Sequence, residues 1–375
     1  MILPGDTPES IAAAVRCIRS GGLLGLPTET VYGLAANADD ETAVAQIFKA
    51  KGRPADHPLI VHVADARAVA HYASEVPEFA RQLMQAFWPG PLTLILPRRP
   101  GVANATAGGN STIGLRCPSH PVAQALLNAL MDCRAALPMT ATSSSPAIQS
   151  APNRASTAPT DIGPDPVIAS AARQSMPLPV WGLAAPSANQ FGRVSPTTAA
   201  HVQGEFGDDL LILDGGACSV GIESTIIDCS RGQPVLLRPG AIAPEQVQAV
   251  CGVRVVSKDE LLTLSAPTPK ASGTLESHYA PRARVRLMDA QQMQAALHGE
   301  EAGASVAVWH RSLLDLPVST VLSQRMPSDA VIAARQLFAV LRAFDCQGAT
   351  QIWIETPPAA SEWDGVRDRL LRAAS

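Results

Sequence analysis

Short apolar runs, each long enough for one β-strand, recur along the chain, and many of them end in a cluster of polar residues. Helical patterns separate some of these runs, but helices and strands do not alternate strictly. This order predicts an open, mixed α/β sheet. Because 375 residues are too many for one hydrophobic core, we expect two domains.

The first helix is predicted from Thr7, a plausible N-cap, and Pro8, which suits the first helical position. Another helix is expected to start at Ser195-Pro196 and to run to about Phe206. Further helices are predicted from Asp40 and over 77–87. The predicted strands cover residues 23–26, 58–63, 92–96, 112–116, 183–186, 210–213, 225–228 and 235–237.

Residues 133–181 break this pattern, because Ala, Ser, Thr and Pro make up most of the segment from Pro138 to Val180. Such a composition does not bury enough apolar surface to offset the entropy of ordering it. We predict a disordered insert that loops outward and leaves the site intact, with a lid or partner-binding segment as the alternative. The first domain is expected to span residues 1–256, this insert included.

A second irregular stretch, residues 257–284, is predicted to be an interdomain linker. Strand and helix patterns then alternate over 285–375, which predicts a small three-layer parallel domain. Its strands are expected at 285–288, 306–309 and 352–355, and its helices at 290–297, 330–344 and 361–373.

The composition indicates a soluble globular protein, with 46% hydrophobic and 17% charged residues. The net charge of −4 argues against a protein that coats nucleic acid, although it leaves room for a local basic pocket. The seven cysteines form no C-x-x-C pair, which favours reduced thiols, and neither a signal peptide nor a membrane-spanning run is indicated. We therefore expect a cytoplasmic location.

The familiar nucleotide-binding motifs are absent from the sequence, so the polar clusters after the predicted strands carry the functional argument. Ligands of open α/β sheets bind at such strand ends. The first cluster contains Thr28, Glu29 and Thr30, which can orient a small polar substrate or form an ordinary turn. The second contains Lys49, Lys51 and Arg53, which suit a polyphosphate better than a simple helix C-cap.

The remaining clusters repeat this pattern of a strand followed by polar or cationic residues. Arg116 ends one predicted strand, where it can hold a carboxylate or lie on the surface, and Arg238 ends another. A lone strand histidine such as His62 is more typical of a core residue than of a ligand. Ser187 and Asn189 supply neutral hydrogen bonds. The linker pair His278-Tyr279 is either incidental or closes over a site in the first domain.

Together these clusters describe a pocket with several cations, many hydroxyls and few acids. The sequence indicates no serine or cysteine nucleophile with a partnered base. This profile fits phosphate-centred chemistry that works by positioning and charge stabilisation.

Six blocks in this order resemble the threonylcarbamoyl-AMP synthase family: PTETVYGL (27–34), KAKGRPADHPLIVHV (49–63), TIGLRCP (112–118), APSAN (185–189) followed by Ser195-Pro196-Thr197, ESTI (223–226) and LRPG (237–240). The linker and the last domain resemble the long, two-domain form of that family. The resemblance implies a YrdC-like catalytic domain with a twisted mixed sheet, followed by a small Rossmann-like domain.

The reaction implied by the resemblance is a nucleotidyl transfer. L-Threonine, bicarbonate or carbon dioxide, and ATP give threonylcarbamoyl-AMP and pyrophosphate. Mg²⁺ would be held largely by ATP and water. The product would pass to a tRNA threonylcarbamoyl-transferase complex that forms threonylcarbamoyladenosine beside the anticodon.

The resemblance also assigns roles to individual residues. Positions matching the threonine site are Thr30, His62, Arg116, Ala185 and Ser224. Positions matching the ATP site are Lys51, Arg53, His57, Thr112, Ser187, Asn189, Ser195, Arg238, His278 and Tyr279. Two positions depart from the family pattern: His57 stands where many relatives have Asn, and the linker reads Ala-Ser-Gly-Thr instead of Ser-Pro-Gly.

Two other functions are weighed against this one. A carbamoyltransferase that uses carbamoyl phosphate is disfavoured, because the chain lacks the zinc-finger and acylphosphatase-like modules of such enzymes. A double-stranded RNA-binding module is disfavoured by the overall acidity, although weak RNA binding by a basic cavity stays among the expectations.

Overall fold

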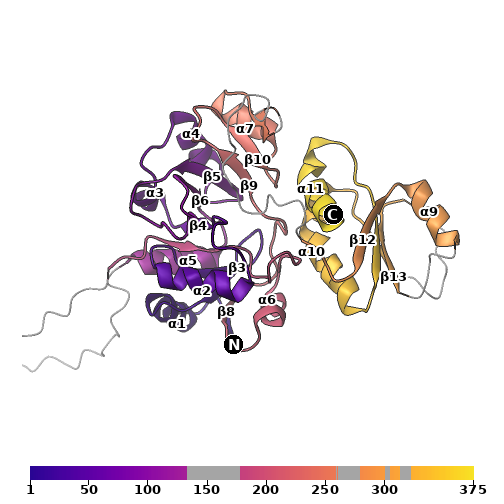
Figure 1. Cartoon of the computed structure of the whole chain (residues 1–375), viewed down its shortest axis with the longest axis horizontal. Coiled ribbons are helices and arrows are strands. Elements are labelled where there is room, and N and C mark those ends of the chain that lie inside the picture. Colours follow the sequence, from indigo (N-terminus) through magenta and orange to yellow (C-terminus); the bar gives the residue numbers. More distant parts are fainter. Residues whose placement is uncertain (133–177, 259, 261–278, 300–304, 313–321) are drawn as a thin grey trace, which may run out of the picture.

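The computed structural model describes residues 1–132, 178–258, 260, 279–299, 305–312 and 322–375. An 11-stranded mixed sheet organises the N-terminal domain, and a separate 4-stranded parallel sheet organises the C-terminal domain (Figure 1). This confirms the expected α/β class. The predicted insert, apart from its last residues, and most of the predicted linker, including His278, lie outside the described residues.

The large sheet combines parallel and antiparallel neighbours in the order β1-β8-β2-β3-β7-β4-β6-β5-β9-β10-β11. Its strands agree with the predicted ones except that β1, β3 and β11 were not expected. The bounds are β1 Ile2–Pro4, β2 Leu24–Leu26, β3 Gly33–Asn37, β4 Ile60–Val63, β5 Leu92–Pro97, β6 Thr112–Arg116, β7 Gly182–Ala184, β8 Leu211–Asp214, β9 Thr225–Asp228, β10 Val235–Arg238 and β11 Val256–Ser257.

Side-chain caps fix the starts of several helices around this sheet. Thr7 accepts a hydrogen bond from Ser10 N at the start of α1, and Asp40 accepts from Thr42 N and Ala43 N at the start of α2. Gly52 ends α2 in the left-handed region, with φ of 63°. The helix bounds are α1 Pro8–Arg19, α2 Glu41–Lys51, α3 Ala66–Tyr72, α4 Glu78–Phe87, α5 Pro121–Met131, α6 Ala199–Phe206 and α7 Pro244–Cys251.

The predicted start of the helix at Ser195-Pro196 is wrong, since α6 begins at Ala199 with Thr198 as its N-cap. The Thr198 hydroxyl accepts a hydrogen bond from His201 N, whereas the Ser195 hydroxyl donates to Glu223 Oε1 at 2.5 Å. A tertiary contact therefore engages the serine that the local pattern assigned to the cap.

The two ends of the segment outside the described residues lie side by side. Arg19 of α1 donates to Leu130 O at 3.1 Å and to Leu178 O at 2.9 Å. In addition, Val180 N donates to Leu130 O at 3.1 Å. The chain therefore returns to the domain next to the point where it leaves α5.

The C-terminal sheet has the strand order β12-β15-β13-β14, and its neighbouring strands are parallel. Helices α10 and α11 lie between this sheet and the N-terminal domain, and α9 lies on the other face (Figure 1). The expected three-layer arrangement is confirmed, although β14 was not predicted. The bounds are β12 Arg284–Met288, α9 Ala290–His298, β13 Val306–His310, β14 Leu322–Arg325, α10 Ala330–Cys346, β15 Gln351–Glu355, the 3₁₀ turn η1 Ser361–Trp363 and α11 Asp364–Ala373.

One hydrophobic cluster joins the two domains. Val31, Val194 and Ile222 of the first domain belong to the same buried cluster as Phe338 of α10 and Val366 of α11. Burial of such apolar surface is the main favourable term in association. The C-terminal domain is therefore packed onto the first domain through a shared core.

Two further sequence expectations, on membrane spans and on cysteines, are compared with the described residues. Within them, no helix is long and apolar enough to cross a membrane. Six of the seven cysteines lie in the described part of the chain, and these six are free thiols.

Candidate active site

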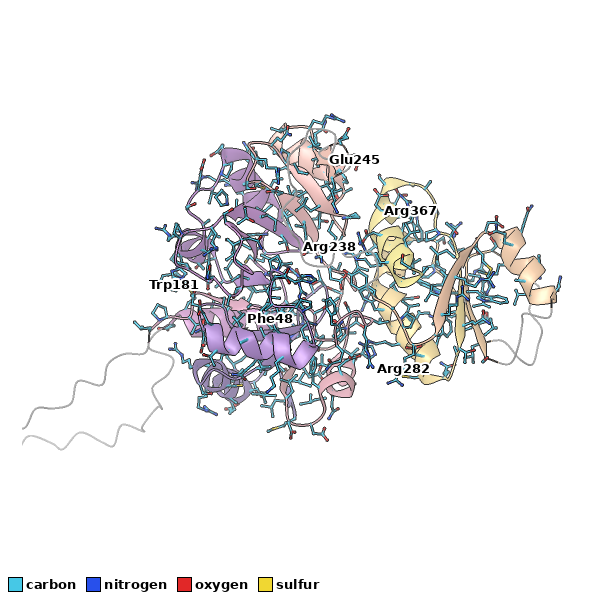
Figure 2. The ribbon with its side chains drawn as sticks, in the orientation of Figure 1. Phe48, Trp181, Arg238, Glu245, Arg282 and Arg367 are labelled. Carbon is cyan, nitrogen blue, oxygen red and sulfur yellow. The ribbon has the colours of Figure 1, made fainter. Side chains whose placement is uncertain are left out.

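A small cavity at the strand ends of the large sheet gathers residues from distant parts of the sequence. Nine of the predicted site residues line it: Thr30, Arg53, His62, Arg116, Ala185, Ser187, Ser224, Arg238 and Tyr279. The same walls also contain Thr28, Val31, Gly33, Ile60, Pro186 and Glu223. Arg238 lies on the side of the first domain that faces the C-terminal domain (Figure 2).

The loop between β2 and β3 is shaped by Thr28. Its hydroxyl accepts hydrogen bonds from Thr30 N and Val31 N, both at 3.2 Å, which is the local side-chain-to-backbone pattern of a hydroxyl turn. It donates to Val31 O at 2.6 Å. The turn presents the Thr30 hydroxyl to the cavity.

Arg116, the last residue of β6, is 4% exposed, so its alternative interpretation as a surface residue is wrong. Its Nη2 lies 2.7 Å from Glu29 Oε1, and its Nη1 donates to the Thr30 hydroxyl at 2.7 Å. Because a planar guanidinium presents several donors in a fixed geometry, these contacts hold its position firmly.

Arg238, the last residue of β10, is 3% exposed and binds the loop before β9. Its Nε and Nη2 donate to Ser224 O at 3.1 and 2.9 Å, and Nη2 also donates to the Ser224 hydroxyl at 3.2 Å. That hydroxyl lies 2.7 Å from the Thr93 hydroxyl of β5. The contacts of Ser224 with Arg238 and Thr93 thus hold the guanidinium of Arg238 and the hydroxyl of Ser224 in place at the cavity wall.

Lys51 is the last residue of α2, Arg53 follows just after the C-cap Gly52, and both are buried. Lys51 Nζ donates to Ser187 O at 2.6 Å and to Asn189 O at 2.5 Å, so it supports the cavity loop from behind. Burial, assisted by the charge of Arg53, lowers the pKa of Lys51 to about 7. Arg53 lines the cavity and donates to Pro58 O at 3.0 Å, whereas Lys49 points to solvent.

His62 is 4% exposed in β4, as a core residue would be, and it also lines the cavity. Its Nδ1 has no hydrogen-bond partner within the described residues. Burial and the charge of Arg116 lower the pKa of His62 to about 3, so the ring is neutral at pH 7. A neutral imidazole there can accept or donate one hydrogen bond to a ligand.

Tyr279 brings the end of the linker region to the cavity. It is fully buried and has a φ of 66°, a left-handed conformation that is uncommon for a residue other than glycine. Its ring lies 5.4 Å from that of Phe338 on α10. The tyrosine therefore sits between the cavity and the C-terminal domain.

The cavity has a volume of about 40 Å³, room for little more than a water molecule. A nucleotide is far larger, so ATP fits only if neighbouring side chains move.

The other predicted ATP-site residues within the described part of the chain do not line this cavity. Asn189 is buried beside it, and its side-chain amide donates to Gln190 O at 2.7 Å and to Arg193 O at 2.9 Å. Ser195 reaches the site through Glu223. His57 lies near Phe191, with 5.9 Å between the ring centroids, and Thr112 pairs with Pro97 at the start of β6.

Two buried acids at the site were not among the assigned site residues, although the first polar cluster included Glu29. Glu29 pairs with Arg116, and Glu223 pairs with Arg369 of the C-terminal domain. The sequence shows both acids inside the quoted blocks, but only tertiary structure shows that each meets an arginine. Cations therefore outnumber acids around the cavity, as expected, and the two nearby acids, Glu29 and Glu223, are each paired with an arginine.

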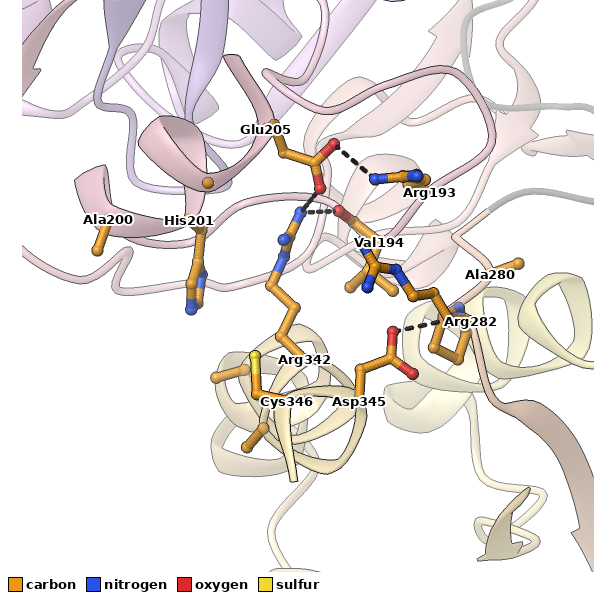
Figure 3. A pocket seen from close by; sticks show the side chains of 14 residues that line it. Arg193, Val194, Ala200, His201, Glu205, Ala280, Arg282, Arg342, Asp345 and Cys346 are labelled. Atoms are coloured by element: carbon orange, nitrogen blue, oxygen red, sulfur yellow. Dashed lines mark hydrogen bonds and ion pairs between the residues drawn. The ribbon is translucent and has the colours of Figure 1, made fainter. Parts of the chain in front are cut away.

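A second cavity of about 400 Å³ lies between the domains and is lined by a different set of described residues (Figure 3). Arg342 of α10 lies 3.0 Å from Glu205 Oε1 of α6. Asp345 accepts hydrogen bonds from the backbone of Arg282 at 2.8 Å and of Ala283 at 3.0 Å. These charged groups hold the domains and the end of the linker region together.

A twisted mixed sheet whose strand ends gather arginines and hydroxyls, with a Rossmann-like domain packed against them, defines a two-domain YrdC-like protein. Residues 16–240 match the family model described as "Telomere recombination" (Sua5_yciO_yrdC). Residues 242–375 match the model "Threonylcarbamoyl-AMP synthase, C-terminal domain". The chain belongs to the threonylcarbamoyl-AMP synthase family.

Relatives match over nearly the whole chain. The threonylcarbamoyl-AMP synthase of Pyrococcus abyssi is 35% identical over 97% of this chain and 94% of its own length. The threonylcarbamoyl-AMP synthase of Bacillus subtilis is 33% identical over 97% of this chain and 92% of its own length. The crystal structure of P. abyssi Sua5 complexed with L-threonine has a TM-score of 0.76 and 33% identity, covering 98% of this chain and 95% of that one.

A second P. abyssi Sua5 structure, of a variant with an adjacent histidine and tyrosine changed to alanine, has a TM-score of 0.78 and 32% identity. It covers 100% of this chain and 96% of that one. The expected YrdC-like and Rossmann-like architecture is thereby confirmed.

Proposed function

We propose that this chain makes threonylcarbamoyl-AMP and pyrophosphate from L-threonine, bicarbonate or carbon dioxide, and ATP. The observation that carries the proposal is the convergence of Arg53, Arg116 and Arg238 with the hydroxyls of Thr30, Ser187 and Ser224 on one cavity. Three cations suit the negative charge of a triphosphate and of an amino-acid carboxylate. Family membership and the threonine named for the P. abyssi structure support it.

The reaction needs positioning more than a nucleophilic side chain. The threonine amine adds to carbon dioxide and loses a proton, which gives a carbamate. A carbamate oxygen then attacks the α-phosphorus of ATP, and the bond to the β-phosphate oxygen breaks to release pyrophosphate. Arginines can stabilise the charge that develops on both phosphate groups.

We assign the threonine end of the cavity to Thr30, His62, Arg116, Ala185 and Ser224. Arg116 would share its guanidinium between Glu29 and the carboxylate of the substrate. His62 is neutral and has an open Nδ1 among the described residues, so it can bind a polar group of threonine without adding charge.

The ATP end is assigned to Arg53, Ser187, Arg238 and Tyr279, with Lys51, Asn189 and Ser195 supporting the loops behind them. The roles proposed for His57, Thr112 and His278 rest on the family resemblance alone. The P. abyssi variant changed an adjacent histidine and tyrosine, and this chain carries such a pair at 278–279.

Magnesium is assigned to the triphosphate of ATP, where it would offset charge as pyrophosphate leaves. The described residues contain no group of three or more His, Cys, Asp or Glu side chains that could hold a metal. The acids nearest the cavity, Glu29 and Glu223, are already paired with arginines. This arrangement fits an ion that arrives with the nucleotide.

The adenylate product would then be used by a tRNA threonylcarbamoyl-transferase complex in the cytoplasm.

The deciding experiment measures pyrophosphate release from Mg-ATP by the full chain. We expect release to require both L-threonine and bicarbonate, and the product to contain AMP and carbamoylated threonine by mass spectrometry. Release with carbamoyl phosphate in place of bicarbonate would favour a carbamoyltransferase instead. Tight RNA binding without turnover would favour an RNA-binding module.

A further inference from the structure

Glu223 places a carboxylate in the wall of a cavity proposed to bind an anionic nucleotide. It is 7% exposed and lines the cavity together with Arg53 and Arg238. Burial by itself would raise the pKa of Glu223, but the charges of Arg369 and Arg238 outweigh it and hold that pKa below its usual value. The side chain is therefore an anion at neutral pH, and an uncompensated anion there would repel phosphate groups.

The compensating charge comes from the other domain. Arg369 of α11 is fully buried, and its Nε lies 3.0 Å from Glu223 Oε2. Its Nη2 donates to Glu223 O at 3.0 Å, and its Nη1 donates to Pro239 O at 2.5 Å. One guanidinium therefore binds the loop before β9 and the residue that follows Arg238.

The same guanidinium also contacts the residue at the end of the linker region. Its Cζ lies 5.7 Å from the centroid of the Tyr279 ring, which is within the range of a cation–π contact. Arg369 thus joins Glu223, Pro239 and Tyr279, which come from three separate segments around the cavity.

The backbone of α10 and α11 packs closely against the segments before β9 and after β10. A Cβ atom at Gly365 of α11 would lie 2.8 Å from Ile222 Cδ1 and 2.9 Å from Gly240 O. A Cβ atom at Gly221 would lie 2.4 Å from Arg335 Cα of α10. Glycine allows such close approach because it has no side chain. Both helices therefore pack against the loop that carries Glu223 and Ser224, and α11 also packs against Gly240, two residues after Arg238.

We propose that Arg369 is a positioning residue for the nucleotide: it neutralises Glu223, so that the positive charge of Arg53 and Arg238 remains available to the phosphates of ATP. The inference rests on the proposed function and extends it, because it makes the C-terminal domain part of the ATP site. Without Arg369, the charge of Glu223 would cancel that of one of the two cavity arginines.

The test compares Arg369→Ala with the double variant Glu223→Gln/Arg369→Ala in the full chain. We expect Arg369→Ala to raise the KM for ATP at least about tenfold, because it leaves a buried carboxylate unpaired beside the phosphates. The double variant should return to within about threefold of the wild type, since the unpaired charge is gone. Arg367→Ala is the matched control and should leave the KM for ATP unchanged: this arginine lies on the same helix but pairs with Asp364.

A purely structural role predicts a different result. If Arg369 served only to hold the domains together, the double variant would be as impaired as Arg369→Ala or worse. That result, or an unchanged KM for ATP in Arg369→Ala, would overturn the proposal. Thermal unfolding of each variant reports whether it is folded.

Two additional measurements keep the test decisive. If Arg369→Ala does not fold, Arg369→Lys replaces it: the retained charge should keep the KM for ATP within about threefold of the wild type, and a rise beyond about tenfold would contradict charge compensation. Calorimetric binding of the magnesium complex of a non-hydrolysable ATP analogue is measured in parallel. Weaker binding by Arg369→Ala supports the inference even if the wild type forms no threonylcarbamoyl-AMP, which would refute only the proposed reaction.

Discussion

Arg116 and Glu29 form a buried ion pair, with 2.7 Å between Nη2 and Oε1. Both side chains are nearly inaccessible, at 5% and 6% exposed. Glu29 Oε2 also accepts a hydrogen bond from Ser119 N at 3.1 Å. The arginine proposed to bind the threonine carboxylate is therefore held by a carboxylate of the protein itself.

Glu29→Gln should destabilise the protein by about 3 kcal/mol, because it leaves the buried charge of Arg116 without its partner. Urea unfolding measures the change in the free energy of unfolding. Glu78→Gln, at an exposed acid 78% accessible at the start of α4, should change it by less than about 0.5 kcal/mol. Equal stability of Glu29→Gln and the wild type would mean that the pair contributes nothing.

Arg238→Ala should lower kcat/KM for pyrophosphate release by about 100-fold or more, because the cavity loses a fixed cation and Ser224 loses its anchor. The same loss is expected for Arg53→Ala. The assay uses saturating L-threonine and bicarbonate, and circular dichroism checks that each variant is folded. Arg81→Ala removes an exposed arginine of α4 and should retain full activity. Full turnover by both cavity variants would rule out the proposed ATP site.

The stability contributed by His62 should depend on pH. Its pKa is about 3 in the folded protein and 6.5 in the unfolded chain, so between these values the unfolded chain binds a proton that the folded protein does not. This contribution is complete above about pH 6.5 and is lost progressively as the pH falls toward 3.

Relative to His62→Gln, the wild type should therefore lose about 2 kcal/mol of unfolding free energy between about pH 7.5 and about pH 5. Urea unfolding of both proteins at the two pH values measures this difference. Parallel changes in wild type and variant would show that His62 titrates normally in the folded protein.

Gly365→Ala should destabilise the protein by about 1–3 kcal/mol, since the new methyl group would meet Ile222 and the Gly240 carbonyl at less than 3.0 Å. Gly204→Ala in α6 is the matched control, because nothing lies within 4 Å of its Cβ position. That variant should gain up to about 1 kcal/mol from the better helix propensity of alanine. Denaturant unfolding compares the two, and a stabilised Gly365→Ala would contradict the close packing of α11.

Local sequence signals predicted the parts of the fold that local physics decides. Thr7 and Asp40 cap their helices as expected, and the apolar runs that became β5, β6 and β9 form strands. β3, with the sequence GLAAN, was missed because small residues on a strand buried on both faces show no alternation. Ser195 misled the prediction because Glu223, distant in sequence, engages its hydroxyl.

The candidate site was predicted unevenly for the same reason. Arginines at strand ends, such as Arg116 and Arg238, can be recognised from the pattern of an apolar run followed by a cation. The counter-charges cannot, because Glu29 pairs with a residue 87 positions away and Glu223 with one 146 positions away. Arg369 carries no local signal at all, since on the sequence it is one of several arginines in an ordinary helix.

The hydrogen bonds of Arg19 to Leu130 and Leu178 have a practical consequence. Hydrogen bonds hold the end of α5 and the chain at Leu178 next to each other. The length of the segment that connects them therefore has little effect on stability, because the entropy cost of closing a loop grows only slowly with its length. The junction is therefore a natural place to graft a fluorescent reporter or an affinity tag in exchange for residues 140–174. Such a chimaera should keep the midpoint of thermal unfolding of the parent.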